Sequence, residues 1–151
     1  MTLPKSLLAA GLSLILMVVG AVGPWAKVLG VVTINGTTGG RDGWIVIVAA
    51  AVALLILIVV AATRRRWLAL IPLLAGAVGA ATTGYDIVDI NSLYQGRVAS
   101  AQWGIYLALA GSIGLMAASI GAILEIRRTP RAATAAPAEA VESEHPTAPP
   151  A

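Results

Sequence analysis

The chain has 151 residues, of which 58% are hydrophobic and 11% charged, and it contains no cysteine. In soluble domains roughly a quarter of all residues are charged, so this composition excludes a water-soluble globular domain and predicts a protein embedded in lipid. The lack of cysteine excludes disulfides, thiolate catalysis and cysteine-bound metals. The net charge of +3 does not indicate nucleic-acid binding, because seven of the ten basic residues lie in segments expected beside one membrane face.

The first candidate transmembrane span covers residues 7–23 and follows a short leader that contains Lys5. A cleaved signal peptide is the alternative, since small residues stand at 21–23 in cleavage-like positions. Two features count against cleavage: the apolar run is longer than the roughly 7–15 residues usual for a signal peptide, and Pro24 would follow the cut. We therefore expect a retained first helix.

Residues 24–43 connect the first two spans. The stretch 28–34 is rich in β-branched residues, and Asn35-Gly36 is typical of a two-residue hairpin turn because both positions tolerate positive φ. The return arm, 37–40, has few strand-forming residues beyond its two threonines. The sequence leaves open whether residues 28–40 form a hairpin or an irregular loop.

The second span, 44–62, has nineteen residues without a charge and is followed by three arginines. As a helix it would be about 28 Å long, close to the thickness of the bilayer hydrocarbon. An arginine at the bilayer centre costs about 2.5–3.5 kcal/mol, so the three arginines mark the cytoplasmic side.

The third and fourth spans, 67–84 and 101–124, are rich in small residues. Small residues at four-residue spacing let two helices approach closely within lipid, where no hydrophobic effect drives them together. We expect the third and fourth helices to pack against each other through such positions. The candidate helix-packing residues are Ala75, Gly76, Gly79 and Ala80 in the third span and Gly111, Gly114 and Ala118 in the fourth.

Residues 85–100 form the second connection on the outer side. Apolar residues recur at helical spacing in 87–94, with polar residues between them. This pattern predicts either a short interfacial amphipathic helix or a polar extension of the third span. We expect that helix to stop at Gly96 and the next to be capped by Ser100.

The basic residues predict the orientation of the chain. Seven are expected on one side and three, Lys27, Arg41 and Arg97, on the other, which places both termini in the cytoplasm and the protein in the cytoplasmic (inner) membrane. Trp25, Trp44, Trp67 and Trp103 fall at span ends, as in an aromatic belt. The seven residues on the cytoplasmic side are Lys5, Arg64, Arg65, Arg66, Arg127, Arg128 and Arg131.

The resulting fold class is an all-α membrane protein with four transmembrane helices. Residues 1–126 form the transmembrane domain. Residues 127–151 are dominated by Ala, Pro, Glu and Thr, which provide too little apolar surface to offset chain entropy, so they are predicted to be a disordered cytoplasmic tail.

The sequence shows no catalytic, cofactor-binding or metal-binding constellation. The only histidine, His145, lies in the predicted tail, and every Asp and Glu lies outside the predicted spans. Asp86 and Asp89 are three residues apart and would share a helix face, where a cation site is conceivable. The serines and threonines within the spans have no base nearby and are expected to hydrogen-bond within their own or a neighbouring helix. We therefore predict that the protein is not an enzyme and uses no cofactor.

Two short motifs resemble a known group of proteins. Pro24-Trp25 closes the first span, and Gly39-Gly40-Arg41-Asp42-Gly43-Trp44 opens the second. Over residues 20–62 this pattern resembles uncharacterised four-helix integral membrane proteins of actinobacteria. The resemblance implies the four-helix fold and a bacterial source, and it implies no activity.

These observations predict a non-enzymatic integral membrane protein that acts by association. Its expected partners are membrane lipids and either a membrane protein, to which it would be an accessory subunit, or further copies of itself. The alternative is a small passive transporter or channel for an apolar or lipid-like solute. A water path or an apolar cleft between the helices would favour the alternative, and a tightly closed bundle would count against it.

Overall fold

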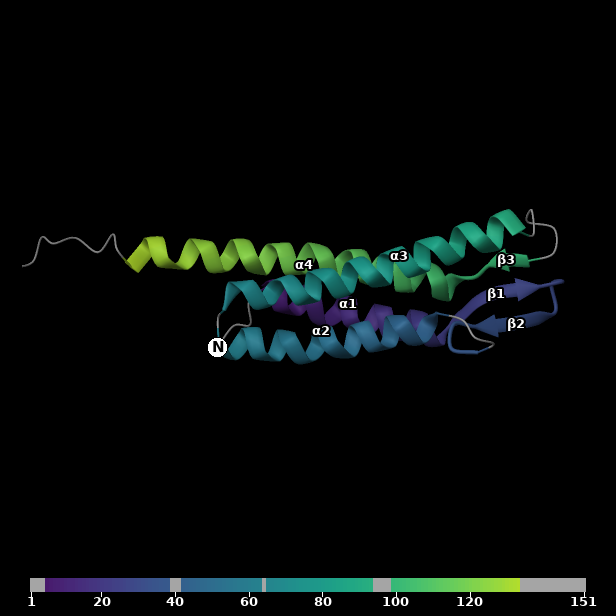
Figure 1. The fold of residues 1–151 in the computed structure, drawn as a ribbon, viewed down its shortest axis with the longest axis horizontal. Coiled ribbons are helices and arrows are strands. Elements are labelled where there is room, and N and C mark those ends of the chain that lie inside the picture. The colour runs from purple at the N-terminus through teal and green to yellow at the C-terminus, as the bar shows by residue number, and fades with distance from the viewer. Residues whose placement is uncertain (1–4, 39–41, 64, 94–98, 134–151) are drawn as a thin grey trace, which may run out of the picture.

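The computed structural model describes residues 5–38, 42–63, 65–93 and 99–133. Four long helices lie side by side, and a small sheet covers one end of the bundle (Figure 1). The chain passes back and forth, so the start of α1, the α2–α3 connection and the end of α4 share the other end, here named the arginine end. The helices are α1 (Lys5–Val22), α2 (Gly43–Thr63), α3 (Leu70–Leu93) and α4 (Trp103–Ala133), with a 3₁₀ turn η1 (Arg66–Ala69) before α3.

Four helical stretches are long and apolar enough to cross a membrane, the third of them beginning in η1, which confirms the four predicted helices. These stretches are Lys5–Val22, Gly43–Thr63, Trp67–Ser92 and Trp103–Glu125. The third is longer than predicted because the polar segment after residue 84 continues α3 instead of forming a separate helix. Ile90 shows why, since its side chain is buried in the core and extends the packed face of α3.

The helix α4 continues to Ala133 and so includes the first residues, 127–133, of the segment predicted as a disordered tail. Its last turns contain Glu, Arg and Ala, which favour helix, and the helix passes through Pro130 before it ends. At the arginine end, the Ser6 hydroxyl donates a 2.6 Å hydrogen bond to Glu125 Oε2 and joins the start of α1 to α4. The rest of the predicted tail, 134–151, and the positions Arg41, Arg64, Gly96, Arg97 and His145 lie outside the described residues.

The sheet has three antiparallel strands, β1 (Pro24–Val28), β2 (Val32–Asn35) and β3 (Ala99–Ala101), in the order β2-β1-β3. Lys27 in the central strand pairs with Thr33 on one side and Ser100 on the other. The third strand was not predicted, and the predicted role of Ser100 as a helix cap is wrong because this residue lies within β3.

A hairpin does form, but the predicted turn at Asn35-Gly36 is wrong. The chain reverses at Leu29 and Gly30, which both have positive φ, 52° and 71°, and Val31 N–H bonds Val28 O at 3.2 Å. This is the geometry of a type I′ turn. Gly36 instead follows the end of β2 and packs against the bundle.

The most extensive helix contact is between α1 and α4, and α3 packs on another side of α4. The helix α2 packs against α3 and, less closely, α1. Side chains with no exposed surface, including Met17, Val46 and Leu115, fill the interior. The bundle is therefore tight around α4 and looser between α1 and α2.

Candidate functional site

The predicted helix-packing glycines contact two different helices. A Cβ on Gly76 would lie 2.8 Å from Met116 Cγ, and one on Gly79 would lie 2.6 Å from Ser112 Oγ, so both glycines of α3 face α4. Gly111 of α4 instead faces α1, where a Cβ would lie 2.6 Å from the Met17 backbone nitrogen.

The other predicted packing residues lie nearby. Gly114 also faces α1, with its Cβ position 2.6 Å from Ser13 Oγ. Ala75 and Ala118 are buried, and Ala80 is half-buried. We expected the small residues of the fourth helix to pack against the third. This is wrong for Gly111 and Gly114, which pack against α1. All four glycines face a neighbouring helix of the same chain; Gly76, Gly79 and Gly111 are buried, and Gly114 is half-buried.

Four of the buried hydroxyls bond to their own helices, whereas that of Ser6 bonds to Glu125 of α4. Ser13 donates to Ala9 O, Thr83 to Gly79 O and Ser112 to Ala108 O, each at 2.8 Å and each four residues back along the helix. Ser119 does the same to Leu115 O. This is the usual arrangement for Ser and Thr in apolar helices, and with the proton directed to a backbone carbonyl these groups are not set up as activated nucleophiles.

One acid does lie on a buried helix face. Asp86 is 6% exposed and follows Gly79 and Thr83 along the packed side of α3, within the candidate span Trp67–Ser92. The expectation that every acid lies outside the spans is therefore wrong for Asp86, for the half-buried Asp89 and for Glu125, which ends the fourth span. Within the described ranges, no group of three or more His, Asp or Glu side chains comes together as a metal site.

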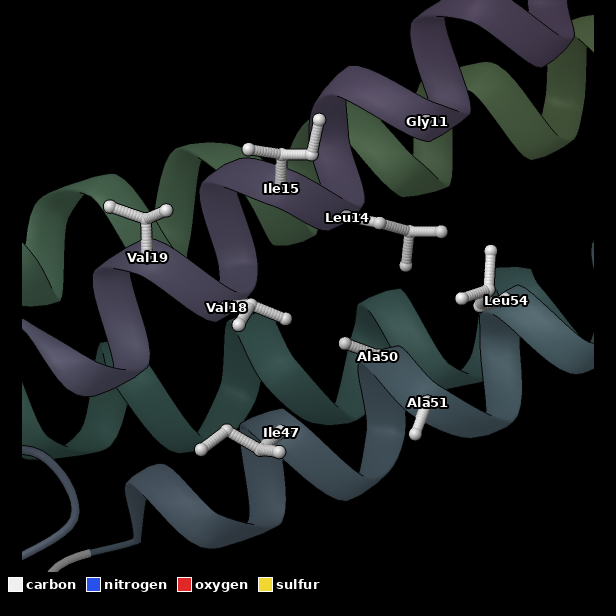
Figure 2. Close-up of a pocket in the computed structure, with 9 residues that line it drawn as sticks. All are labelled: Gly11, Leu14, Ile15, Val18, Val19, Ile47, Ala50, Ala51 and Leu54. Carbon is white, nitrogen blue, oxygen red and sulfur yellow. The ribbon is translucent and has the colours of Figure 1, made fainter.

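An apolar groove opens between α1 and α2 (Figure 2). It has a volume of about 600 Å³, and no polar surface lines it. In Figure 2, Leu14 of α1 and Leu54 of α2 both extend into the gap, and Val18 and Ala50 lie farther along it. The lining residues are Gly11, Leu14, Ile15, Val18 and Val19 from α1 and Ile47, Ala50, Ala51 and Leu54 from α2. The sequence could not indicate this groove, because it depends on how far apart α1 and α2 lie.

Trp25 joins the sheet to the bundle. Its side chain has no exposed surface, and its indole Nε1–H donates a 2.8 Å hydrogen bond to Gly20 O at the end of α1. Gly36 lies directly against the ring, where a Cβ would clash. The Trp25 carbonyl also accepts the Gln102 N–H at 2.9 Å, just before α4. The predicted belt position is wrong for Trp25, whereas the other three tryptophans are exposed.

The turn of the β1–β2 hairpin carries an exposed apolar patch, here named the hairpin tip: Leu29, Val31 and Val32. Their side chains are 71%, 82% and 56% exposed. In Figure 1 the hairpin projects from the sheet end along the long axis of the bundle. Only Ile34 of β2 is partly covered by the core.

Comparison with known proteins gives no match among protein families, curated proteins or solved structures.

Proposed function

We propose that this chain is a non-enzymatic integral membrane protein that acts by association, as an accessory subunit of a membrane complex or as a homo-oligomer. The four apolar helices support insertion into a membrane. The observation that carries association is the hairpin tip, because three adjacent large apolar side chains in water are unfavourable unless a partner covers them.

Leu29 strengthens this argument through its backbone. A bulky residue with φ of 52° is a conformational outlier, and the left-handed region costs roughly 1–2 kcal/mol for a residue other than glycine. Asparagine or glycine would suit both this φ and the exposure of the position. A leucine that is unfavourable on both counts is explained by a contact made outside the chain.

The geometry of the hairpin favours a protein over lipid as the partner. The five residues of β1 extend roughly 16 Å at about 3.3 Å per residue beyond the end of α1. The hairpin projects past the end of α1 (Figure 1), so with the helices across a membrane the tip would lie beyond the hydrocarbon. The proposed partner is therefore a protein domain or a second copy outside the cytoplasm.

The substitution Leu29→Asn tests the proposal. We expect the variant to unfold at the same temperature as the wild type or higher, because asparagine accepts positive φ, and to lose the associated protein. The measurement is mild-detergent purification of the tagged chain from its native membrane, with the mass and stoichiometry of the complex determined.

Thr33→Asn is the matched control, since Thr33 is exposed on the same hairpin but lies away from the turn. It should retain the complex. Recovery of the wild type as a lone monomer, or of the same complex from the Leu29→Asn variant, contradicts association through the hairpin tip.

We further propose that the arginine end lies in the cytoplasm of a bacterial cell. The support is the distribution of basic residues, because seven are expected at the arginine end and only three at the opposite end. A reporter active only outside the cytoplasm is expected to be silent when fused after residue 131 and active when the chain is cut and fused after residue 38. The reverse pattern would overturn this orientation.

A second candidate function is passive carriage of a lipid-like solute, which the α1–α2 groove favours. The close α1–α4 contact and the buried Trp25 at the sheet end count against an axial pore. Reconstitution into vesicles that contain a fluorescent phospholipid tests this candidate by measuring movement of the lipid between leaflets. A rate equal to that of protein-free vesicles eliminates it.

A further inference from the structure

We propose that the groove between α1 and α2 is a binding site for a hydrocarbon chain of a membrane lipid. The proposal uses the membrane insertion argued above but does not depend on association through the hairpin tip. It assigns the groove an occupant and makes no claim of transport.

The groove lies at the depth of lipid hydrocarbon. Its lining covers residues 11–19 of α1, which runs from 5 to 22, and residues 47–54 of α2, which runs from 43 to 63. With both helices across a membrane, these positions extend from the middle of the bilayer toward the sheet end. Lipid chains of the leaflet on that side are the molecules present at this depth.

The chemistry of the lining selects an apolar occupant. All lining surface is apolar, so the groove offers a ligand no hydrogen-bond donor, acceptor or charge. Water and ions gain nothing there, since a buried water needs two to four polar partners. An unfilled groove would deprive Leu14, Val18 and Leu54 of dispersion contacts, which a hydrocarbon chain restores.

The shape of the groove favours a flexible chain over a partner helix. The volume of about 600 Å³ lies within the usual range for sites that hold small molecules. A helix is roughly 10–12 Å wide and approaches another closely where small residues line the contact. In this protein the close contacts between helices are the glycine-lined ones that α1 and α3 make with α4. The groove is instead lined mainly by Leu, Ile and Val, whose irregular surface a flexible chain can follow.

Gly11 provides a way to fill the groove without damage to the bundle. A Cβ at this position would have no atom within 4 Å, and Gly11 lines the groove, so we expect a larger side chain to enter the groove without a clash. Gly84 in α3 is equally open and is not part of the groove. Gly11→Leu and Gly84→Leu thus make the same change at a groove position and at a control position, and both replace glycine by a better helix former.

The test is native mass spectrometry of the full chain, extracted with mild detergent from vesicles of phosphatidylethanolamine and phosphatidylglycerol. We expect one retained lipid on the wild type and on Gly84→Leu, and at least a tenfold lower retained fraction on Gly11→Leu. Ala51→Leu, at another groove position, should repeat the loss, whereas Ala62→Leu, three turns farther along α2, should not.

Vesicles that differ in one lipid property show whether the protein binds the acyl chains or the head group of the lipid. Shortening both acyl chains should lower retention, and exchanging the head group for phosphatidylcholine should leave it unchanged. Retention that follows the head group alone overturns the proposal, as does equal retention on the wild type and Gly11→Leu. A wild-type dimer that Gly11→Leu converts to a monomer would show a second copy in the groove and would also overturn it. The Gly11→Leu test measures binding in the groove and the Leu29→Asn test measures association through the hairpin tip, so either proposal can fail while the other holds.

Discussion

Replacing Gly111 with leucine is expected to separate α1 from α4 and unfold the bundle. A Cβ at this position would lie 2.6 Å from the Met17 nitrogen and 2.7 Å from the Ser13 carbonyl oxygen, which are both backbone atoms. Overpacking against side chains costs about 1–3 kcal/mol, because side chains can rotate away. Backbone atoms within a helix cannot, so we expect a loss of at least about 3 kcal/mol. Thermal unfolding in detergent measures the effect.

Leucine substitutions at two other glycines provide the comparison for the loss of stability. Gly84→Leu should melt close to the wild-type temperature, because nothing lies within 4 Å of its Cβ position. Gly79→Leu should fall between the two, since its nearest neighbours are the Ser112 hydroxyl and the tip of Met17, which can shift. A Gly111→Leu variant as stable as Gly84→Leu would show that α1 and α4 do not meet at this point.

Removing the Trp25 side chain is the second substitution with a large expected effect. Trp25→Ala deletes a fully buried indole, and truncations of this kind cost about 3–5 kcal/mol. Trp25→Phe keeps most of the apolar contact but loses the hydrogen bond to Gly20 O, so we expect a loss of about 1 kcal/mol in addition to a smaller packing term. Thermal unfolding and protection of the sheet from protease measure both losses.

Trp44→Ala is the control for this series, because Trp44 is 60% exposed and lies at the same end of the bundle. It should have a small effect on unfolding. Equal destabilisation by Trp25→Ala and Trp44→Ala would mean that Trp25 does not join the sheet to the helices.

The four helices could be predicted because length and hydropathy alone determine them. The run from Trp44 to Ala62 fits this rule, and α2 extends only one residue beyond it at each end. The polar residues after 84 could not be assigned as surely, since the same pattern suits a separate amphipathic helix. The continuation of α3 to Leu93 depends on the burial of Ile90, which is a tertiary contact.

The hairpin shows why local turn signals fail. Asn35-Gly36 is the stronger turn sequence, but Gly36 is needed where the chain passes against the Trp25 ring. The turn lies instead at Leu29, a residue that local preference excludes. Likewise β3, with the sequence Ala-Ser-Ala, has no intrinsic preference for a strand and forms through its pairing with β1.

The candidate sites were harder to predict because they depend on which helices are neighbours. A stripe of small residues indicates a close contact but not the identity of the other helix, which is why Gly111 was expected against α3. The groove and the burial of Asp86 depend on the spacing and rotation of helices. The sequence contains that information only through packing among distant segments.

The central position of β1 in the sheet has a consequence for the order of events during synthesis. The strand continues directly from α1, and its neighbour β3 leads directly into α4, so the first helix made has its largest interface with the last. Translation proceeds at about 5–20 residues per second, so for several seconds after α1 is made, Gly20 and Met17 lack the contact with α4. A chain that stops before Trp103 never acquires that interface. The cell's quality-control machinery therefore meets an incomplete bundle until the final helix emerges.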